Sequence, residues 1–307
     1  MASSASSSCT LPSGTIVGPL VLGGFLQWLL LGLVLGSAAR YYFLLSARNG
    51  GLYAYLVGGM LVLNALEAGF NTNTIYRTTV CPLEDPARPE WTLCIQPTVV
   101  ALIGCLAHAF LLERCWRSTK KSWLTVVVLT FFALIALGSG LAVAATAFHT
   151  PTTRILIPVT STSASHSIAM TAWLVMTATA DLAILDVLLF VNLRNSIAML
   201  NGANAVPDLP RVPSRHATGH GQSGGGRRDV LTPSRILEMG GLNALATVLN
   251  MVLYFAKGKT ADHIPAQFAV GSLYTLTILH ALLARRAPDP PPPPSLALPV
   301  IRPQGSL

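Results

Sequence analysis

The sequence predicts an all-α polytopic membrane protein, a seven-transmembrane-helix bundle with its N-terminus outside and its C-terminus in the cytosol. The first observation is composition, because 52% of the 307 residues are hydrophobic, 10% are charged and the mean hydropathy is +0.57. A soluble domain of this size has no need of so much apolar surface. The second observation is that the apolar residues gather in stretches of about 20, the length of helix that crosses about 30 Å of hydrocarbon.

Seven such stretches occur, and a helix is the expected structure of each. In lipid, a segment must satisfy its own backbone hydrogen bonds, and these segments are too long for the strands of a barrel. The first stretch is expected to stay in the mature protein, because the residues before it lack the basic region of a secretory signal. The predicted helices are Val17 to Phe43, Leu52 to Ile75, Ile95 to Leu112, Trp123 to Phe148, Ser167 to Leu193, Ile236 to Phe255 and Ile264 to Ala284.

The third observation is the distribution of positive charge, which predicts the orientation of the bundle. When the loops are assigned alternately to two sides, fifteen of the 20 Lys and Arg fall on one side. The positive-inside rule places that side in the cytosol. The net charge of +8 therefore indicates basic loops next to anionic lipid, and we expect no nucleic-acid partner.

These assignments divide the chain into five parts. They are an extracellular N-terminus (1–16), the first five helices (17–193), a flexible basic cytosolic loop (194–235), the last two helices (236–284) and a Pro-rich cytosolic tail (285–307). The loop is too rich in Gly, Pro and polar residues to bury a core. The tail contains PDPPPPP, which favours polyproline II, the conformation that SH3 and WW modules bind; a passive spacer is the alternative. Besides the lipid bilayer, a cytosolic protein bound to the loop or tail is therefore an expected partner.

No metal or cofactor is predicted. His216 and His220 of the loop are close in sequence, but the further ligands of a metal site are missing around them. Cys81 and Cys94 share a predicted outer loop, where a disulfide persists. Such a bridge would close a loop of about 14 residues and stabilise the fold by about 3 kcal/mol in the chain-entropy account. Two free thiols are the alternative.

The segment TADLAILDVLLF, residues 179–190, carries two aspartates inside a predicted helix. On insertion scales each Asp costs about 2.5 to 3.5 kcal/mol at a helix centre, which nearly cancels the gain from the apolar residues around it. Insertion is feasible if the carboxyls have partners, are protonated or face interior water. Each of these outcomes places Asp181 and Asp186 inside the bundle. Because they are rotated by about 140° from one another, they are expected to have different neighbours.

Further polar residues follow helical spacing in the other predicted helices. Asn64, Glu67 and Asn71 form a stripe in the second helix, and Asn243 and Asn250 share one face of the sixth. Histidines lie toward the cytosolic ends of the third and seventh helices, and either is expected to be able to meet Asp186. Such groups make interhelical hydrogen bonds of about 0.6 kcal/mol each, or they line a cavity for a small ligand, an ion or a proton. The intrabundle candidates are Asn64, Glu67, Asn71, His108, Asp181, Asp186, Asn243, Asn250 and His280.

Catalysis is not expected. The sequence contains no G-x-S-x-G nucleophile motif, no HExxH or paired CxxC, and no phosphate-binding G-x-x-x-x-G-K. The last predicted helix also lacks a lysine that could bind retinal as a Schiff base. The polar residues are therefore candidates for binding and for proton transfer, and no catalytic residue is assigned.

Several segments resemble a large group of basidiomycete integral membrane proteins. RCWRSTKKSW, at 114–123, resembles the R-x-W-R-x-S-[KR]-[KR]-x-W joint after the third helix of that group. TAD at 179–181, GGLNALATVLNMVLYF at 240–255 and SLYTLTILHALLARR at 272–286 are similar to its fifth, sixth and seventh helices. This chain departs from the pattern at Leu276, where the group has Asn, and at Asn64 and Glu67, where it has Asp and His. The resemblance implies seven helices but no activity, because the C-terminal half of the group is catalogued as a domain of unknown function.

G-protein-coupled receptors offer a second comparison. Glu113 and Arg114 lie at the cytosolic end of the third predicted helix, where those receptors carry an acidic-Arg-aromatic triplet. The seventh helix lacks N-P-x-x-Y, so an interfacial ion pair between Glu113 and Arg114 is the expected role of these residues.

Three functions fit these observations. The first is a receptor-like protein that senses a small ligand through its outer half and acts on cytosolic partners. The second is a transporter or proton-conducting bundle that uses Glu67, Asp181 and Asp186. The third is a membrane scaffold without a cavity. The expected location is the plasma membrane or an endomembrane.

Overall fold

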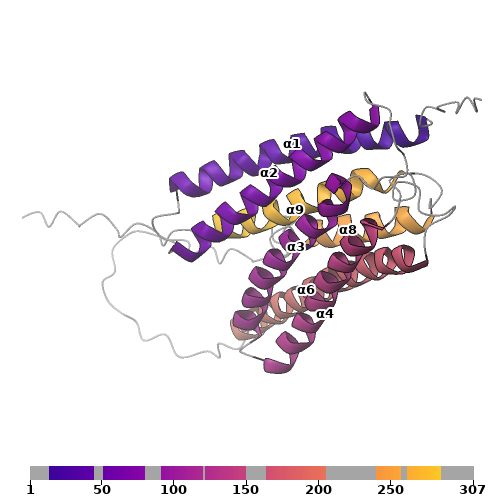
Figure 1. The fold of residues 1–307 in the computed structure, drawn as a ribbon. Helices are drawn as coiled ribbons and strands as arrows, with labels where there is room; N and C mark the ends of the chain where they lie inside the picture. Colours follow the sequence, from indigo (N-terminus) through magenta and orange to yellow (C-terminus); the bar gives the residue numbers. More distant parts are fainter. Residues whose placement is uncertain are drawn as a thin grey trace, which may run out of the picture.

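The chain folds as an all-helical bundle in a computed structural model that describes residues 14–44, 51–79, 91–119, 122–149, 164–204, 240–256 and 261–284 (Figure 1). The helices run lengthwise beside one another. Within the described residues they are α1 (Gly14–Leu44), α2 (Gly51–Thr79), α3 (Trp91–Ser118), α4 (Trp123–Ala147), α6 (Ala164–Asn204), α8 (Gly241–Ala256) and α9 (Ile264–Leu283).

Six of these helices, all except α8, are long and apolar enough to cross a membrane. This confirms the predicted helical membrane class. Helix α8 has 16 residues, which extend over about 24 Å and so fall short of a full span. The predicted sixth helix began at 236, but residues 236–239 lie outside the described part of the chain.

The helices form a ring in which each one packs against the next, and α9 closes the ring on α1. Helix α3 contacts α2, α4, α6 and α9, and α9 also contacts α2 and α8. These two helices are the most buried of the six spans. The interior of the bundle is therefore built around the contact between α3 and α9.

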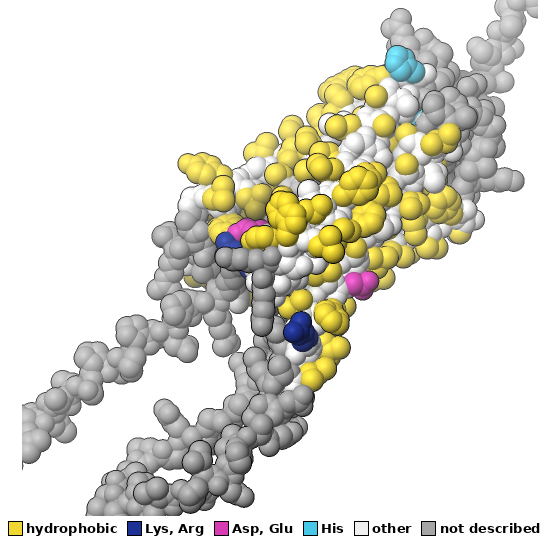
Figure 2. Space-filling view, turned by 90° about the horizontal axis from the view of Figure 1, so that it is seen from below, with side chains coloured by type: hydrophobic (Ala, Val, Ile, Leu, Met, Phe, Trp, Pro, Cys, Tyr) yellow, Lys and Arg dark blue, Asp and Glu magenta, His cyan; other side chains and the backbone are white. Residues whose placement is uncertain are grey.

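The outer surface is hydrophobic, as expected for a protein that faces lipid. Figure 2 shows one long face covered mostly by hydrophobic side chains, with isolated charged ones. Large exposed side chains include Phe25, Phe43, Tyr55, Trp123 and Phe131. A water-soluble monomer rarely exposes such a continuous apolar surface.

The two ends of the bundle can be distinguished by the helix termini that they contain. We call one the predicted outer end, where α1, α3, α6 and α9 begin, and the other the predicted cytosolic end, where these helices finish. The start of α1 and the finish of α9 lie at opposite ends of the bundle (Figure 1).

Helices α1, α2, α3 and α6 are all longer than the sequence predicts, and α6 exceeds its predicted bounds the most. Helix α6 continues to Asn204, whereas the prediction ended it at Leu193 and assigned 194–204 to a loop. The extension contains no proline, and its only glycine is Gly202, so nothing in it breaks a helix. The remainder of the predicted loop, the metal-pair candidates His216 and His220, and the tail after residue 284 lie outside the described residues.

Candidate functional site: a buried polar cluster between α3, α6 and α9

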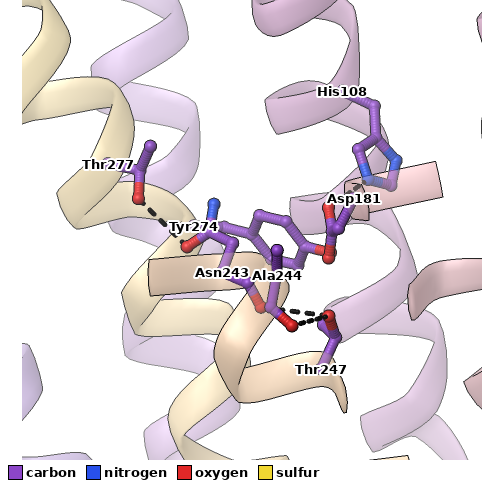
Figure 3. A network of polar contacts seen from close by, with 7 residues as sticks. All are labelled: His108, Asp181, Asn243, Ala244, Thr247, Tyr274 and Thr277. Atoms are coloured by element: carbon purple, nitrogen blue, oxygen red, sulfur yellow. Dashed lines mark hydrogen bonds and ion pairs between the residues drawn. The ribbon is translucent and has the colours of Figure 1, made fainter. Parts of the chain in front are cut away.

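Three polar side chains from three helices meet in the interior of the bundle (Figure 3). His108 of α3 lies with its Nε2 2.9 Å from Oδ1 of Asp181 on α6. The hydroxyl of Tyr274 on α9 donates to Oδ2 of the same carboxyl at 2.6 Å. The rings of His108 and Tyr274 meet edge to face, with their centroids 5.6 Å apart. Each oxygen of Asp181 therefore has its own partner, and we call these three residues the carboxyl cluster.

Burial makes this cluster energetically significant. Asp181, His108 and Tyr274 are 4%, 2% and 1% exposed. Charges at such a place interact more strongly than in water, and the loss of one partner leaves the others without compensation. The cluster therefore joins α3, α6 and α9 through contacts that are expensive to break. The prediction that Asp181 lies inside the bundle is confirmed.

Asp186 differs from the prediction, because its side chain is exposed on α6 and does not lie inside the bundle. The rotation of about 140° that separates it from Asp181 turns it toward the surroundings. Asp186 comes 20 residues after His166, the start of the span in α6, which corresponds to about 30 Å along a helix. That distance is about the thickness of the hydrocarbon. Asp186 can therefore lie at the level of the lipid headgroups, where an exposed carboxylate is tolerated. The expectation that a histidine meets Asp186 is also wrong: His108 meets Asp181, and His280 is exposed.

Glu67 of α2 is 0% exposed, and neither of its carboxyl oxygens has a hydrogen-bond partner among the described residues. The carboxyl lies against the backbone of Gly271 on α9, where a Cβ atom would be 2.2 Å from Oε2. Only glycine leaves room for this approach. The prediction of an interior position for Glu67 is confirmed, and the absence of partners for its oxygens among the described residues makes its burial costly.

The other members of the α2 stripe have partners on neighbouring helices. Asn64 Nδ2 donates to Thr275 Oγ1 at 2.6 Å, and Ser272 Oγ donates to Asn64 Oδ1 at 3.1 Å. One turn beyond Glu67, Asn71 Nδ2 donates to Oε1 of Gln27 on α1 at 2.9 Å. Asn64 and Asn71 thus act as interhelical contacts between α2, α9 and α1.

Helix α8 contributes two buried asparagines. Thr277 of α9 donates to Asn243 Oδ1 at 3.0 Å (Figure 3), whereas Asn243 Nδ2 has no partner in the part of the chain that is described. The same holds for Oδ1 of Asn250. Both side chains point into the bundle, as the sequence predicts, but neither one is fully satisfied.

At the predicted cytosolic end, Glu113 contacts one residue of its own helix, α3, and one residue of α2. It forms an ion pair with Arg117, one turn later, and accepts a hydrogen bond from Tyr53 of α2 at 3.1 Å. The structure thus adds Arg117 as an ion-pair partner of Glu113, and the pair with the adjacent Arg114 stays a prediction. Cys94 is buried in α3, and Cys81 lies outside the described residues, as does any bridge between them.

A cavity lies directly beside the carboxyl cluster. His108 and Tyr274 form part of its wall, together with Thr177 of α6 and Asn250 of α8. Its volume is about 30 Å³, enough for one or two water molecules. Thr177 Oγ1 and Asn250 Oδ1 have no hydrogen-bond partner within the described segments, so the wall of this central cavity carries polar atoms that a water molecule would satisfy.

Two further cavities lie nearer the ends of the bundle. One, of about 50 Å³ at the predicted outer end, is lined by Gln96, His166, His263 and Gln267 among others. The other, of about 190 Å³ at the predicted cytosolic end, is lined by His280, Thr277 and four further residues. Sites for drug-sized ligands have about 300 to 1,000 Å³. All three cavities are smaller, so water, a proton or a small ion suits them better than an organic ligand.

Tyr274 and Gln267 are the important residues that the sequence analysis did not select. Both occur on α9, where they line the central cavity. Their spacing provides the signal that could have found them: Gln267, Gly271 and Tyr274 follow one another at steps of four and three, and therefore share one helix face. A tyrosine on the interior face of a membrane helix also requires a partner for its hydroxyl.

No family model matches this chain, and comparison with curated proteins and with solved structures gives no match either. Among the described residues, no group of three or more His, Cys, Asp or Glu could hold a metal ion. The geometry of the polar groups is therefore the basis for a functional conclusion.

Proposed function

We propose that the protein is a receptor-like integral membrane protein whose helix arrangement follows the protonation of the carboxyl cluster. One observation carries this function: Asp181 is a buried carboxyl that accepts from His108 and Tyr274, and so joins α3 and α9 to α6. Ionisable groups inside membrane segments mark proton relays and ligand sites. Histidine is also the side chain that changes charge near neutral pH.

The chemistry of the cluster provides a switch. An ionised Asp181 accepts a hydrogen bond at each oxygen. A proton added to this carboxyl converts one oxygen from an acceptor to a donor, which weakens the contact to Tyr274 or to His108. Because each contact spans two helices, protonation favours a different spacing of α6 and α9. A buried ionisable group that biases two packing arrangements is a recognised form of pH switch.

A purely structural scaffold fits less well. Polar groups that only hold helices together are expected to be satisfied, because an unpaired polar group in the interior is costly. Glu67, Thr177 and Asn250 each have a buried polar atom without a partner among the described residues. Costly groups of this kind are typical of functional sites.

The test is a distance measurement at two pH values. Spin labels at Leu44 of α1 and Leu193 of α6, which are 61% and 50% exposed, would be placed on the purified protein in lipid nanodiscs. We expect the label separation to differ between about pH 5 and about pH 8, the range in which histidine changes charge. His108→Gln should abolish the difference, because it removes the imidazole that contacts Oδ1 of Asp181. The matched control, His280→Gln, changes an exposed histidine outside the cluster and should preserve it. Equal separations at both pH values would contradict the proposed function.

Transport is the second candidate, and Glu67 is the observation that favours it. A completely buried carboxyl with two unpartnered oxygens is the type of group that transporters use to carry a proton or a cation. In proteoliposomes with a pH gradient, this candidate predicts proton flux above that of protein-free vesicles, and its loss in Glu67→Gln. Asp186→Asn, which changes an exposed carboxyl, should leave the flux intact. A proton flux equal to that of protein-free vesicles would exclude transport as the function.

The remaining expectations belong to the same proposal. We propose seven spans with the C-terminus in the cytosol, membership of the basidiomycete group described above, no enzymatic activity, and a cytosolic protein partner for the basic loop or the tail. The distribution of Lys and Arg supports the orientation. The receptor-like function needs such a partner, because a change in helix spacing acts only if something on the cytosolic side detects it.

A further inference from the structure

We propose that protons reach Asp181 from the predicted outer end, through water held in the outer and central cavities and past the side chain of Gln267. This inference rests on the proposed function and adds the route and its side. It assigns Gln267 as a positioning residue between two water sites.

The central cavity has what ordered water requires. A buried water needs room and about two to four polar partners. The cavity offers about 30 Å³, and Thr177 Oγ1 and Asn250 Oδ1 on its wall are unpartnered in the described part of the chain. Thr177 precedes Asp181 by one helical turn, so water bound there lies close to the cluster. Water at this place connects Thr177 and Asn250 to His108 and Tyr274, which line the same space.

The outer cavity has similar properties. It is about 50 Å³ in volume and lies between the beginnings of α1, α3, α6 and α9 and the finish of α4 and α8. Gln96 Nε2 on its wall lacks a partner among the described residues. His166 and His263 also line it. This outer cavity therefore has polar groups on its wall and lies at the end of the bundle where α9 begins.

Gln267 joins the two cavities, because its side chain lines both. It is 7% exposed and lies two turns before Tyr274 on α9. A glutamine amide both donates and accepts hydrogen bonds, so it can hold a water molecule on each side. An apolar side chain of similar size would interrupt the hydrogen-bonded chain at this point.

The opposite side of the cluster is packed differently. Beyond Asp181 toward the predicted cytosolic end, the interior between α3, α6 and α9 is filled by Leu111, Ile184, Leu188, Ile278 and Leu282, each at most 4% exposed. The buried polar side chains on the α8 side, Asn243 and Thr277, bond to one another. The wide cavity at that end shares no lining residue with the central cavity. Gln267 lines both the outer and the central cavity, whereas no residue lines both the central and the cytosolic cavity, so access from the outer end is favoured.

The titratable groups along this route are few. The central cavity is faced by His108 and Cys105 of α3 and by Tyr274 of α9, and Asp181 is reached from it through its partners His108 and Tyr274. Helices α4 and α8 contribute no titratable side chain to its wall. The outer cavity is faced by three titratable side chains: His166, whose Nδ1 lies 3.0 Å from Thr146 Oγ1, His263, and Tyr254 of α8, whose ring meets that of His263 edge to face. A change in the fluorescence of Trp173, which lines the central cavity, therefore reports the protonation of a small number of groups.

Trp173 provides a reporter, because it lines the central cavity and is 5% exposed. The full chain would carry Phe in place of the other four tryptophans, Trp28, Trp91, Trp116 and Trp123. After reconstitution into vesicles of neutral phospholipid, the external pH is lowered rapidly and the emission of Trp173 is followed. Molecules are sorted by orientation through protease access to the C-terminal tail.

We expect a fast change of emission from the molecules whose tail is protected inside the vesicle. The others should respond only after a protonophore equilibrates the interior. Gln267→Leu should slow the fast change by about tenfold or more, because an apolar side chain raises the barrier to proton movement. Gln267→Glu should restore it. Gln27→Leu is the matched control: Gln27 is buried on α1 and also has an unpartnered amide nitrogen among the described residues, but it does not line either cavity.

The outcomes separate the route from the function. The emission of Trp173 could respond to pH in detergent and yet change at the same rate in both vesicle orientations. That result would overturn the route and leave the proposed function in place. An unchanged rate in Gln267→Leu would also overturn the route. An emission that does not respond to pH even in detergent, where both ends are accessible, would overturn the proposed function and the route together.

Discussion

Replacing Asp181 with Ala is expected to reduce the free energy of unfolding by about 3 to 5 kcal/mol, the usual cost of removing one partner from a buried charge-assisted network. The reason is the number of contacts that depend on this carboxyl. It accepts from His108 at 2.9 Å and from Tyr274 at 2.6 Å, and both donors are almost completely buried. After the substitution, the imidazole and the phenol lack partners in the interior. Reversible unfolding in mixed detergent micelles would measure the change.

The same helix supplies the control. Asp186→Ala removes a carboxyl of the same type from an exposed position, and exposed substitutions usually change stability by less than about 0.5 kcal/mol. Tyr274→Phe in combination with Asp181→Ala provides a second check. Because the two side chains share one hydrogen bond, the double variant should lose less stability than the two single variants added together. Equal losses for Asp181→Ala and Asp186→Ala would contradict the geometry of the cluster.

The contrast between these two aspartates also shows how far sequence reasoning reaches. The cost of a carboxyl in hydrocarbon predicts that it needs a partner or water, and this placed Asp181 correctly. The same cost does not determine how deep in the bilayer a given carboxyl lies. Helix α6 extends to Asn204, so Asp186 can lie at the level of the headgroups and needs no partner inside the bundle. Sequence hydropathy locates a span only to within several residues, which is comparable to the distance between the two aspartates.

Pairing between helices is the other property that the sequence does not provide. The stripe of Asn64, Glu67 and Asn71 is visible from helical spacing, and all three side chains are buried as that spacing predicts. Their partners on α1 and α9 depend on which helices are neighbours, and helices far apart in sequence can pack together. The contact of α1 with α9, which are the first and last described helices, has no local signal in the sequence. Gln27 and Tyr274 could therefore be recognised as polar, but not matched with Asn71 and Asp181.

Small residues at crowded positions set the distances between these helices, and Gly140 of α4 gives the second large effect. A Cβ atom at this position would lie 2.7 Å from Cβ of Ala101 on α3 and 3.0 Å from Nε1 of Trp173 on α6. Both distances are shorter than normal contacts, so Gly140→Ala must push three helices apart. Overpacking of this kind typically costs about 1 to 3 kcal/mol. The expected result is a lower free energy of unfolding, together with a change in the emission of Trp173.

Gly138 provides the matched control for Gly140→Ala. It lies two residues earlier on the same helix, and a Cβ atom there would meet nothing within 4 Å. Gly138→Ala should raise stability by about 0.5 to 1 kcal/mol, because alanine loses less conformational entropy in a helix than glycine does. Opposite signs at Gly138 and Gly140 would establish that α4 turns its Gly140 face toward α3 and α6. If Gly140→Ala were as stabilising as Gly138→Ala, the close contact of α4 with Trp173 would be wrong, and the wall of the central cavity that Trp173 forms would need to be placed differently.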